Sequence, residues 1–195
     1  MIRLLNQKLD SYTPRLLELE YPHAGILVPV TDKEGDPHLI FTLRSGNLKT
    51  HRGQVAFPGG KKDPEDENLR VTALRETHEE IGLPADHIQI AGQLSQVVSL
   101  HGIIVTPFVG LVPHDYPLTA NPDEIESIFT VPLQFFIDDR RDRTDRLTFL
   151  NTTIHVPSYV WEDYRIWGLS AIVLVDFLNA VYDAGIDITQ PPKGK

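Results

Sequence analysis

The sequence predicts one α/β domain in which helices pack on both faces of a mixed β-sheet. Runs rich in β-branched and aromatic residues are interspersed with stretches of helical periodicity, which indicates both kinds of element. Their order does not follow strict strand–helix–strand repetition, so a doubly wound parallel sheet is disfavoured. At 195 residues, the chain can bury a hydrophobic core without disulfides or a structural metal.

The first half of the sequence predicts a helix, a hairpin and a short strand. Leucines at helical spacing in residues 1–20 indicate a helical lead-in, which Pro14 interrupts. Two β-rich runs, 24–30 and 38–44, flank a turn-forming segment and predict a hairpin. The segments that follow are a polar loop over 45–52 and a short strand over 54–57.

The second half predicts further strands and helices. Residues 67–81 have helical periodicity and precede Gly82, which suits a helix end because glycine readily adopts the left-handed conformation. The charged run 138–146 alternates in sign and is predicted as a solvated loop. The other predicted elements are strands over 88–97, 103–111, 147–150 and 153–160 and helices over 131–136 and 170–184. The expected organisation is a lead-in over 1–20, the domain over 21–188 and a disordered tail over 189–195.

Composition and charge exclude several classes of protein. The chain has no cysteine, which excludes a disulfide scaffold, a thiolate metal centre and a cysteine nucleophile. Its formal net charge of −9 argues against a nucleic-acid-binding protein, which needs a basic surface. From its residues we expect no signal peptide and no membrane-spanning segment. We therefore expect a cytoplasmic protein with no nucleic-acid or membrane partner, and a homodimer stays open.

Three carboxylates share one face of the helix predicted over 67–81. Glu76 and Glu79 are three residues apart, and Glu80 follows Glu76 by four. The apolar side chains that fall roughly opposite are Val71, Leu74 and Ile81. We therefore expect the helix to pack its apolar side on a sheet and to present the carboxylates outward. A hard divalent cation such as Mg²⁺ or Mn²⁺ would relieve their repulsion; the alternative is a solvated acidic surface.

Pro58, Gly59 and Gly60 end the short strand and lead into this helix. Two adjacent glycines let the backbone approach another group closely, so either glycine is a candidate to offer a carbonyl to the same metal ion. The alternative is an ordinary turn. The segment is not a P-loop, because the Gly-Lys-Ser/Thr pattern is missing, and His78 lacks the second histidine of a zinc-protease motif.

Residues 60–83 resemble the Nudix box. In that motif a glycine, five residues, a glutamate and seven residues precede Arg-Glu-U-x-Glu-Glu-x-Gly-U, where U is aliphatic. Residues 75–83 match the second part, with Thr77 at an aliphatic position. The first part is one residue too long, so either Asp66 or Glu67 fills the first acidic position.

A second string, residues 42–60, resembles the signature that precedes the box in Nudix hydrolases of the coenzyme A diphosphatase-like branch. Lys49 stands where an arginine is usual, which keeps the charge but loses the planar fork. The resemblance covers residues 24 to 180. It implies the Nudix α/β/α sandwich with a mixed sheet, a metal-dependent pyrophosphate hydrolase and a small-molecule substrate similar to coenzyme A.

The resemblance and the residue types together assign roles. The residues expected to act are Glu76, Glu79, Glu80 and Gly60 for the metal, Glu79, Glu80 and Arg75 for catalysis, and Arg44, Lys49, Arg52 and Gly59 for substrate binding. Glu79 or Glu80 is expected to assist deprotonation of the attacking water. Arg75 is expected to orient the carboxylates through an ion pair. The basic residues would contact phosphates; the alternative is a solvated loop.

Four further residues carry two interpretations each. Glu124 and His101 are candidate bases or extra ligands, against ordinary loop residues. Trp161 and Trp167 are candidates to stack on an adenine, although core packing is the simpler expectation. The expected reaction splits coenzyme A or a derivative into adenosine 3′,5′-bisphosphate and 4′-phosphopantetheine. The alternatives are hydrolysis of ADP-ribose, a dinucleotide or a nucleoside triphosphate, and a non-catalytic nucleotide sensor, which the intact carboxylates disfavour.

Overall fold

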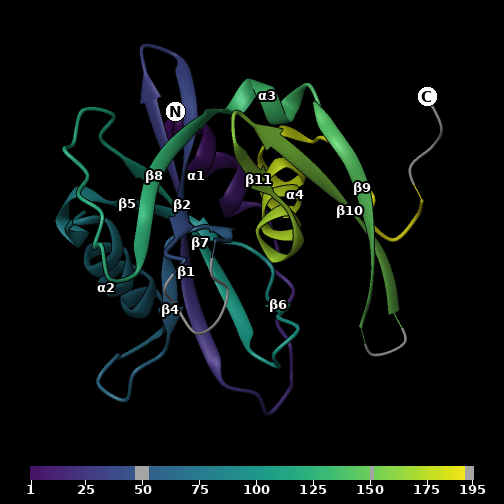
Figure 1. Ribbon diagram of the computed structural model, residues 1–195, viewed down its shortest axis with the longest axis horizontal. Coiled ribbons are helices and arrows are strands. Elements are labelled where there is room, and N and C mark those ends of the chain that lie inside the picture. Colours follow the sequence, from purple (N-terminus) through teal and green to yellow (C-terminus); the bar gives the residue numbers. More distant parts are fainter. Residues whose placement is uncertain (47–52, 150–151, 192–195) are drawn as a thin grey trace.

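The computed structural model describes residues 1–46, 53–149 and 152–191 (Figure 1). In chain order the elements are α1 (Ile2–Asp10), β1 (His23–Lys33), β2 (Asp36–Arg44), β3 (Val55–Ala56), β4 (Gly59–Lys61), α2 (Leu69–Ile81), a 3₁₀ turn (Ala85–His87), β5 (Gln89–Gln93), β6 (Val97–Val98), β7 (Ile104–Val112), β8 (Ile125–Pro132), α3 (Leu133–Ile137), β9 (Arg141–Phe149), β10 (Thr152–Trp161), β11 (Tyr164–Ile166) and α4 (Gly168–Tyr182). In the part of the chain that the structure describes, no helix is long and apolar enough to cross a membrane.

The strands form a mixed sheet, as predicted, and a smaller second sheet. The central path runs β3-β2-β1-β7-β5, with β4 beside β1, β6 beside β7 and β8 beside β2. Strands β1 and β7 are parallel, and their register pairs His23 with Ile104 and Thr31 with Val112. The other pairings in this sheet are antiparallel. The second sheet has the order β11-β10-β9.

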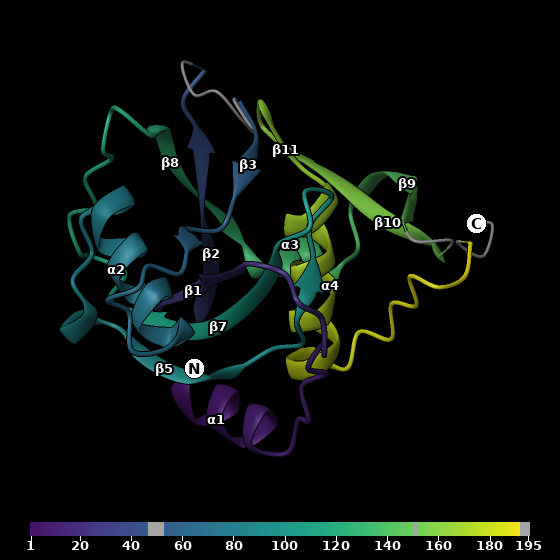
Figure 2. The same ribbon diagram turned by 90° about the horizontal axis from the view of Figure 1, so that it is seen from below.

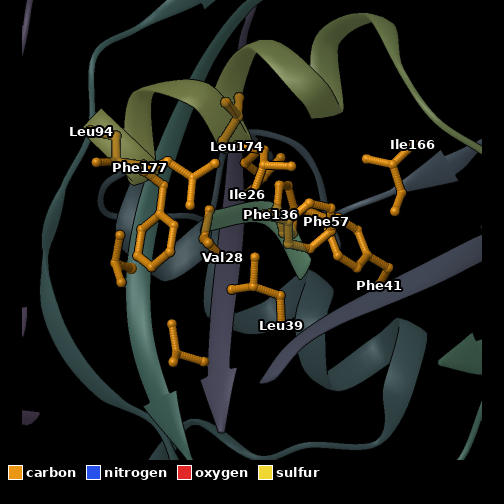
Figure 3. Close-up of a cluster of buried hydrophobic side chains, with 14 of the residues drawn as sticks. Ile26, Val28, Leu39, Phe41, Phe57, Leu94, Phe136, Ile166, Leu174 and Phe177 are labelled. Atoms are coloured by element: carbon orange, nitrogen blue, oxygen red, sulfur yellow. The ribbon is translucent and has the colours of Figure 1, made fainter. Parts of the chain in front are cut away.

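Helices cover both faces of the central strands, which confirms the layered α/β/α arrangement. Figure 2 shows α2 on one side and α4 on the other. Each central strand contributes to two separate cores, one beneath each helix, because successive side chains of a strand point to opposite faces of the sheet. Val28 and Phe41 join the core beneath α4, where Phe177 packs (Figure 3). Leu27 and Ile40, one residue away, join the core beneath α2.

The structure corrects several predicted boundaries. The helix at the N-terminus ends at Asp10, and residues 12–22 have no helix. The strand β8 was not predicted, and the helix expected over 131–136 begins only at Leu133. The tail expected to be disordered falls partly outside the described residues. The predicted hairpin of β1 and β2 is confirmed.

The charged run 138–146 was predicted wrongly as a loop, because most of it belongs to strand β9. Its neighbour β10 pairs with it over most of its length, with Arg146 opposite His155 and Asp145 opposite Val156. Strand β9 is an edge strand of the three-stranded second sheet and leaves many of its side chains in water, so it needs no apolar alternation. Without that alternation the run has the composition of a solvated segment.

A glycine in β1 determines how closely α2 packs on the sheet. A Cβ atom on Gly25 of β1 would lie 2.2 Å from the carbonyl oxygen of Leu69 and 3.0 Å from the backbone nitrogen of Ala73. Any side chain at this position would therefore push the start of α2 away from the sheet. The helix that carries the three glutamates is held against β1 by backbone contact.

We predict that Gly25→Ala lowers the free energy of unfolding by about 1–3 kcal/mol, the usual cost of overpacking. The matched control is Gly46→Ala, where an added Cβ meets nothing within 4 Å; its effect should stay within about 0.5 kcal/mol. Urea denaturation of both variants measures the difference. Equal stabilities would contradict the close packing of α2 on β1.

Candidate active site

Local signals define the two ends of α2. The side chain of Asn68 accepts hydrogen bonds from the backbone N–H groups of Arg70 and Val71, both at 3.1 Å, which is the usual geometry of an N-cap. The helix therefore begins two residues later than the periodicity predicted. Gly82 ends it as predicted, with φ at 69° in the left-handed region.

The face of α2 that meets the sheet differs from the predicted one. Ile81 is buried as expected, but Val71 and Leu74 are only half-buried, while Ala73 and Glu80 are buried instead. The approach to β1 is so close that small side chains fit best there. Two of the three carboxylates are consequently turned toward the sheet and not outward, which corrects the prediction of an outward-facing cluster.

Thr77 occupies an aliphatic position of the box without breaking the packing. Its hydroxyl donates a hydrogen bond of 2.6 Å to the carbonyl oxygen of Ala73, one helical turn earlier. The side chain is fully buried, and the intrahelical bond satisfies its polar atom. The methyl group is left to fill the space of an aliphatic residue.

Asp66 is the acidic residue that anchors Arg75. Its carboxylate accepts bonds from Nε and Nη2 of Arg75 at 3.0 and 2.9 Å, and from the hydroxyl of Thr72 at 2.9 Å. Asp66 is 5% exposed, whereas Glu67 is exposed to solvent. The bidentate contact with Arg75 holds the pKa of the Asp66 carboxyl well below its usual range. The residue that keeps the spacing to Gly60 is thus the one in contact with Arg75.

Arg75 joins this anchor to the other carboxylates. Its Nη1 donates to Oε1 of Glu76 and to Oε2 of Glu79, each at 3.0 Å. Its Nη2 also donates to the carbonyl oxygen of Lys61 at 3.2 Å. One guanidinium therefore contacts two glutamates of α2 and the backbone of β4.

Glu80 is 1% exposed, and among the described residues its carboxylate is contacted by Arg44 and Gly59. Nη1 of Arg44 lies 3.1 Å from Oε1, and the backbone N–H of Gly59 donates to Oε2 at 3.2 Å. Burial nevertheless raises the pKa of the Glu80 carboxyl to about 7, against the opposing effects of Arg44 and Gly59. The charges of Glu76 and Glu124 raise this pKa further. Desolvation therefore outweighs the stabilisation that Arg44 and Gly59 give to the charged form of Glu80.

Gly60 makes room for Glu76. A Cβ atom on Gly60 would lie 2.3 Å from the carboxylate carbon of Glu76, so a side chain here would displace that carboxylate. Burial raises the pKa of Glu76, and the charges of Glu79 and Glu124 add to this rise. The segment Gly59–Lys61 is also strand β4, paired with β1. The two glycines are therefore more than a simple turn.

A cavity of about 890 Å³ opens beside these groups. One part of its wall, here called the carboxylate end, consists of Arg44, Gly59, Gly60, Lys61, Glu76, Glu80 and Glu124. His101 also lines the cavity, whereas Glu79 is not among its described lining residues and is largely exposed beside Arg75. Lys49, His51 and Arg52 lie outside the described residues. Lys61 was not predicted as a site residue, although its position directly after the two glycines was a usable signal.

The donor chemistry of the carboxylate end suits a hard divalent cation. The residues there that could offer oxygen ligands are Glu76, Glu80 and Glu124, and burial raises the pKa of the first two. Within the described residues, no three acidic or histidine side chains are already grouped as a metal-binding cluster. Arginines instead occupy part of the ligand oxygens, through Arg75 on Glu76 and Arg44 on Glu80. A cation here would replace or supplement these ion pairs.

The two tryptophans have different surroundings. Trp161 packs its ring against Phe135, with centroids 5.1 Å apart, as core packing predicts. Trp167 instead lines the cavity and is 38% exposed. Core packing is therefore the wrong interpretation for Trp167.

Comparisons with known proteins identify the family that this chain matches. A family model described as NUDIX domain matches residues 21–150. The chain is 39% identical over 170 residues to a protein named Uncharacterized Nudix hydrolase NudL from Photorhabdus laumondii, covering 83% of this chain and 86% of the relative. A protein of the same name from Yersinia enterocolitica is 38% identical over 160 residues, covering 78% and 77%. A MutT/nudix family protein from Enterococcus faecalis shares the fold, with a TM-score of 0.56, 17% identity and coverage of 94% of this chain and 70% of that chain.

The fold, the box and these matches show that the chain belongs to the Nudix family. Its class is that of the pyrophosphohydrolases, enzymes that hydrolyse phosphorus anhydrides. Within the family it is similar to the proteins named NudL.

We predict that Asp66→Asn destabilises the protein by about 2 kcal/mol near neutral pH, because it removes a charged partner from a partly buried arginine. The control is Glu67→Gln, which changes an exposed neighbour and should have little effect. Because the pKa of Asp66 is lowered on folding, its stabilisation is present above the unfolded pKa of about 4 and is lost as the pH falls below it. The stability difference between the two variants, measured by denaturation, should therefore shrink in acid. A difference that persisted unchanged at low pH would contradict the ion pair.

Proposed function

We propose that this enzyme hydrolyses the pyrophosphate bond of coenzyme A or a derivative, with Mg²⁺ or Mn²⁺ as cofactor. The products would be adenosine 3′,5′-bisphosphate and 4′-phosphopantetheine. The observation that carries the proposal is a pair of carboxylates, the buried Glu80 and the partly buried Glu76, on the wall of a large cavity beside Arg44. Such an arrangement brings anionic ligands and a phosphate-binding guanidinium to one place.

The chain's own residues would supply positioning and proton transfer. Glu76 and Glu80 would hold the cation, with Gly60 and Glu79 as the further ligands expected from the box. A bound divalent cation would neutralise phosphate oxygens and lower the pKa of an attacking water. Arg75 holds Glu76 and Glu79 in place. Glu79, Glu80 or Glu124 would accept the proton of the water.

The choice of coenzyme A rests on the string that precedes the box. Arg44 from that string lines the cavity and pairs with Glu80, so it would contact a substrate phosphate through its remaining donors. Lys49 and Arg52 are proposed to contact phosphate as well. A product-resolved screen of pyrophosphate-linked metabolites separates the proposal from its rivals. ADP-ribose, dinucleotides and nucleoside triphosphates belong in the same screen.

Glu80→Gln should lower kcat about 100-fold or more, because it removes a hard ligand and a candidate base while keeping the shape of the side chain. Since burial raises the pKa of Glu80, the neutral variant should not melt at a lower temperature than the metal-free parent. Glu67→Gln is the matched control and should keep its activity. Exhaustive chelation should abolish turnover in the parent. Near-native turnover by Glu80→Gln would support a site that does not use these carboxylates.

Lys49→Ala and Arg52→Ala test recognition of the 3′-phosphate that distinguishes coenzyme A from dephospho-coenzyme A. A charge-assisted hydrogen bond contributes about 1.5–3 kcal/mol. Its loss should lower kcat/KM for coenzyme A about tenfold or more and leave dephospho-coenzyme A almost unaffected. Equal losses on both substrates would place these residues at the pyrophosphate. No loss on either would identify a solvated loop.

A further inference from the structure

Lys61 is a cation at the carboxylate end whose charge the box does not use. Its side chain is exposed and lines the cavity, directly after Gly59 and Gly60. Within the part of the chain that the structure describes, its ammonium group makes no hydrogen bond and no ion pair. Arg44 is the other lysine or arginine among the described lining residues, and its Nη1 is paired with Glu80 at 3.1 Å. Lys61 is therefore the cation of this wall that is left for a ligand.

The register of β4 determines the face of the sheet to which the Lys61 side chain belongs. Lys61 pairs with Ala24 of β1, and Gly60 pairs with Gly25. Opposed residues of an antiparallel pair share a face, and successive residues alternate between faces. Ala24 belongs to the core beneath α4 and lines the cavity, whereas a Cβ atom on Gly25 would meet the backbone of α2. Lys61 is therefore on the α4 side of β4, opposite to the side of α2 (Figure 2).

The neighbouring Lys62 has a different task. Its backbone N–H donates to the carbonyl oxygen of His23 at 2.9 Å, which continues the contact with β1. Its ammonium group donates to the carbonyl oxygen of Asp66 at 2.6 Å, so it stabilises the loop before α2. Lys62 is not among the described lining residues of the cavity. Of two consecutive lysines, one therefore supports the box and the other faces the cavity.

The backbone of Lys61 is fixed relative to the glutamates. Its carbonyl oxygen accepts a hydrogen bond of 3.2 Å from Nη2 of Arg75, whose Nη1 contacts Glu76 and Glu79. The strand pairing with Ala24 holds the same residue from the other side. The point from which the ammonium group extends thus has a defined position beside the carboxylates. A substitution of the side chain leaves these backbone contacts in place.

The charge balance of the wall favours an anionic ligand for Lys61. Among the described lining residues, Glu76, Glu80 and Glu124 face only Arg44 and Lys61. A diphosphate adds negative charge where carboxylates already outnumber cations. The proposed divalent cation would be held by the glutamates, and Arg44 is already paired. An ammonium group is a compact charge with three donors, which suits a phosphate oxygen.

We propose that Lys61 is a substrate-binding residue whose ammonium group binds an oxygen of the pyrophosphate from the α4 side of β4. The divalent cation held by Glu76 and Glu80 would bind the pyrophosphate from the side of α2. This inference rests on the proposed function, since it assigns a further residue to the same site. It separates Lys61 from Lys49 and Arg52, which are proposed to recognise the 3′-phosphate. The pyrophosphate is common to all the candidate substrates, so Lys61 serves each of them equally.

The first experiment uses Lys61→Met, which keeps an unbranched apolar stem and removes the charge. Loss of a charge-assisted hydrogen bond should lower kcat/KM for coenzyme A about tenfold or more, and for dephospho-coenzyme A by the same factor. Lys33→Met is the matched control, because Lys33 is an exposed lysine at the end of β1 and is not among the described lining residues; it should keep the parental activity. Lys61→Arg, which keeps the charge, should lose less activity than Lys61→Met. The melting temperatures of parent and variants should agree, since the ammonium group has no partner to lose.

Two results of this comparison would overturn the inference. A loss confined to coenzyme A would place Lys61 at the 3′-phosphate. Unchanged kcat/KM on both substrates would leave Lys61 as a solvated side chain. A third result concerns the metal: if a higher Mg²⁺ concentration restored parental turnover to Lys61→Met, Lys61 would act through the carboxylates and not on the substrate. We expect no such restoration, because removing a positive charge does not weaken the attraction of the glutamates for a cation.

A binding measurement separates this inference from the proposed function. Methylenebisphosphonate has a carbon in place of the bridging oxygen of pyrophosphate and cannot be hydrolysed, so calorimetry can follow its binding to the full chain with Mg²⁺ present. Lys61→Met should weaken binding about fivefold or more, and Lys33→Met should leave it unchanged. This result would support the role of Lys61 even if coenzyme A were not hydrolysed, in which case the proposed substrate alone would fail. Equal affinities of the parent and Lys61→Met, or no binding by either, would overturn the inference.

Discussion

The close approach of α2 to strands β1 and β4 is the constraint on which the candidate site depends. Gly25 admits the backbone of the helix, and Gly60 admits the carboxylate of Glu76. Because the helix lies so near the sheet, Glu76 and Glu80 are turned toward the strands and withdrawn from water. A longer side chain at either glycine would move the helix or the carboxylate, and with it the geometry of the box.

Burial changes the protonation behaviour of these carboxylates. Burying a negative charge costs free energy unless the charge is paired. The ion pairs with Arg75 and Arg44 do not fully offset this cost, since the pKa values of Glu76 and Glu80 are raised. Arg75 is itself committed to Asp66, so it orients the carboxylates more than it neutralises them. The divalent cation proposed for this site would offset the repulsion between these carboxylates.

The cavity combines contributions from distant parts of the chain. Its carboxylate end comes from β2, the two glycines, α2 and the loop before β8, while Trp167 at the N-cap of α4 and Ile154 of β10 come from the C-terminal segment. The family fold thus supplies the part of the site that carries the box. The second sheet supplies further walls of the cavity.

Local patterns in the sequence determined the hairpin of β1 and β2, the end of α2 at Gly82 and the identity of the box. Each of these depends on neighbours in the chain, through strand alternation, a left-handed glycine or fixed helical spacing. The β9 strand and the unpredicted β8 depend on partners far away in sequence, so their composition alone was misleading.

The arrangement of the site was decided by tertiary structure. The choice between Asp66 and Glu67 required the position of the Arg75 guanidinium, and the burial of Glu80 required the depth at which α2 sits on β1. Helical spacing placed three glutamates on one face but could not tell which way that face turned. That direction follows from the packing of small residues such as Ala73 beside Gly25, because burial depends on which surfaces meet in space and not on their order along the chain.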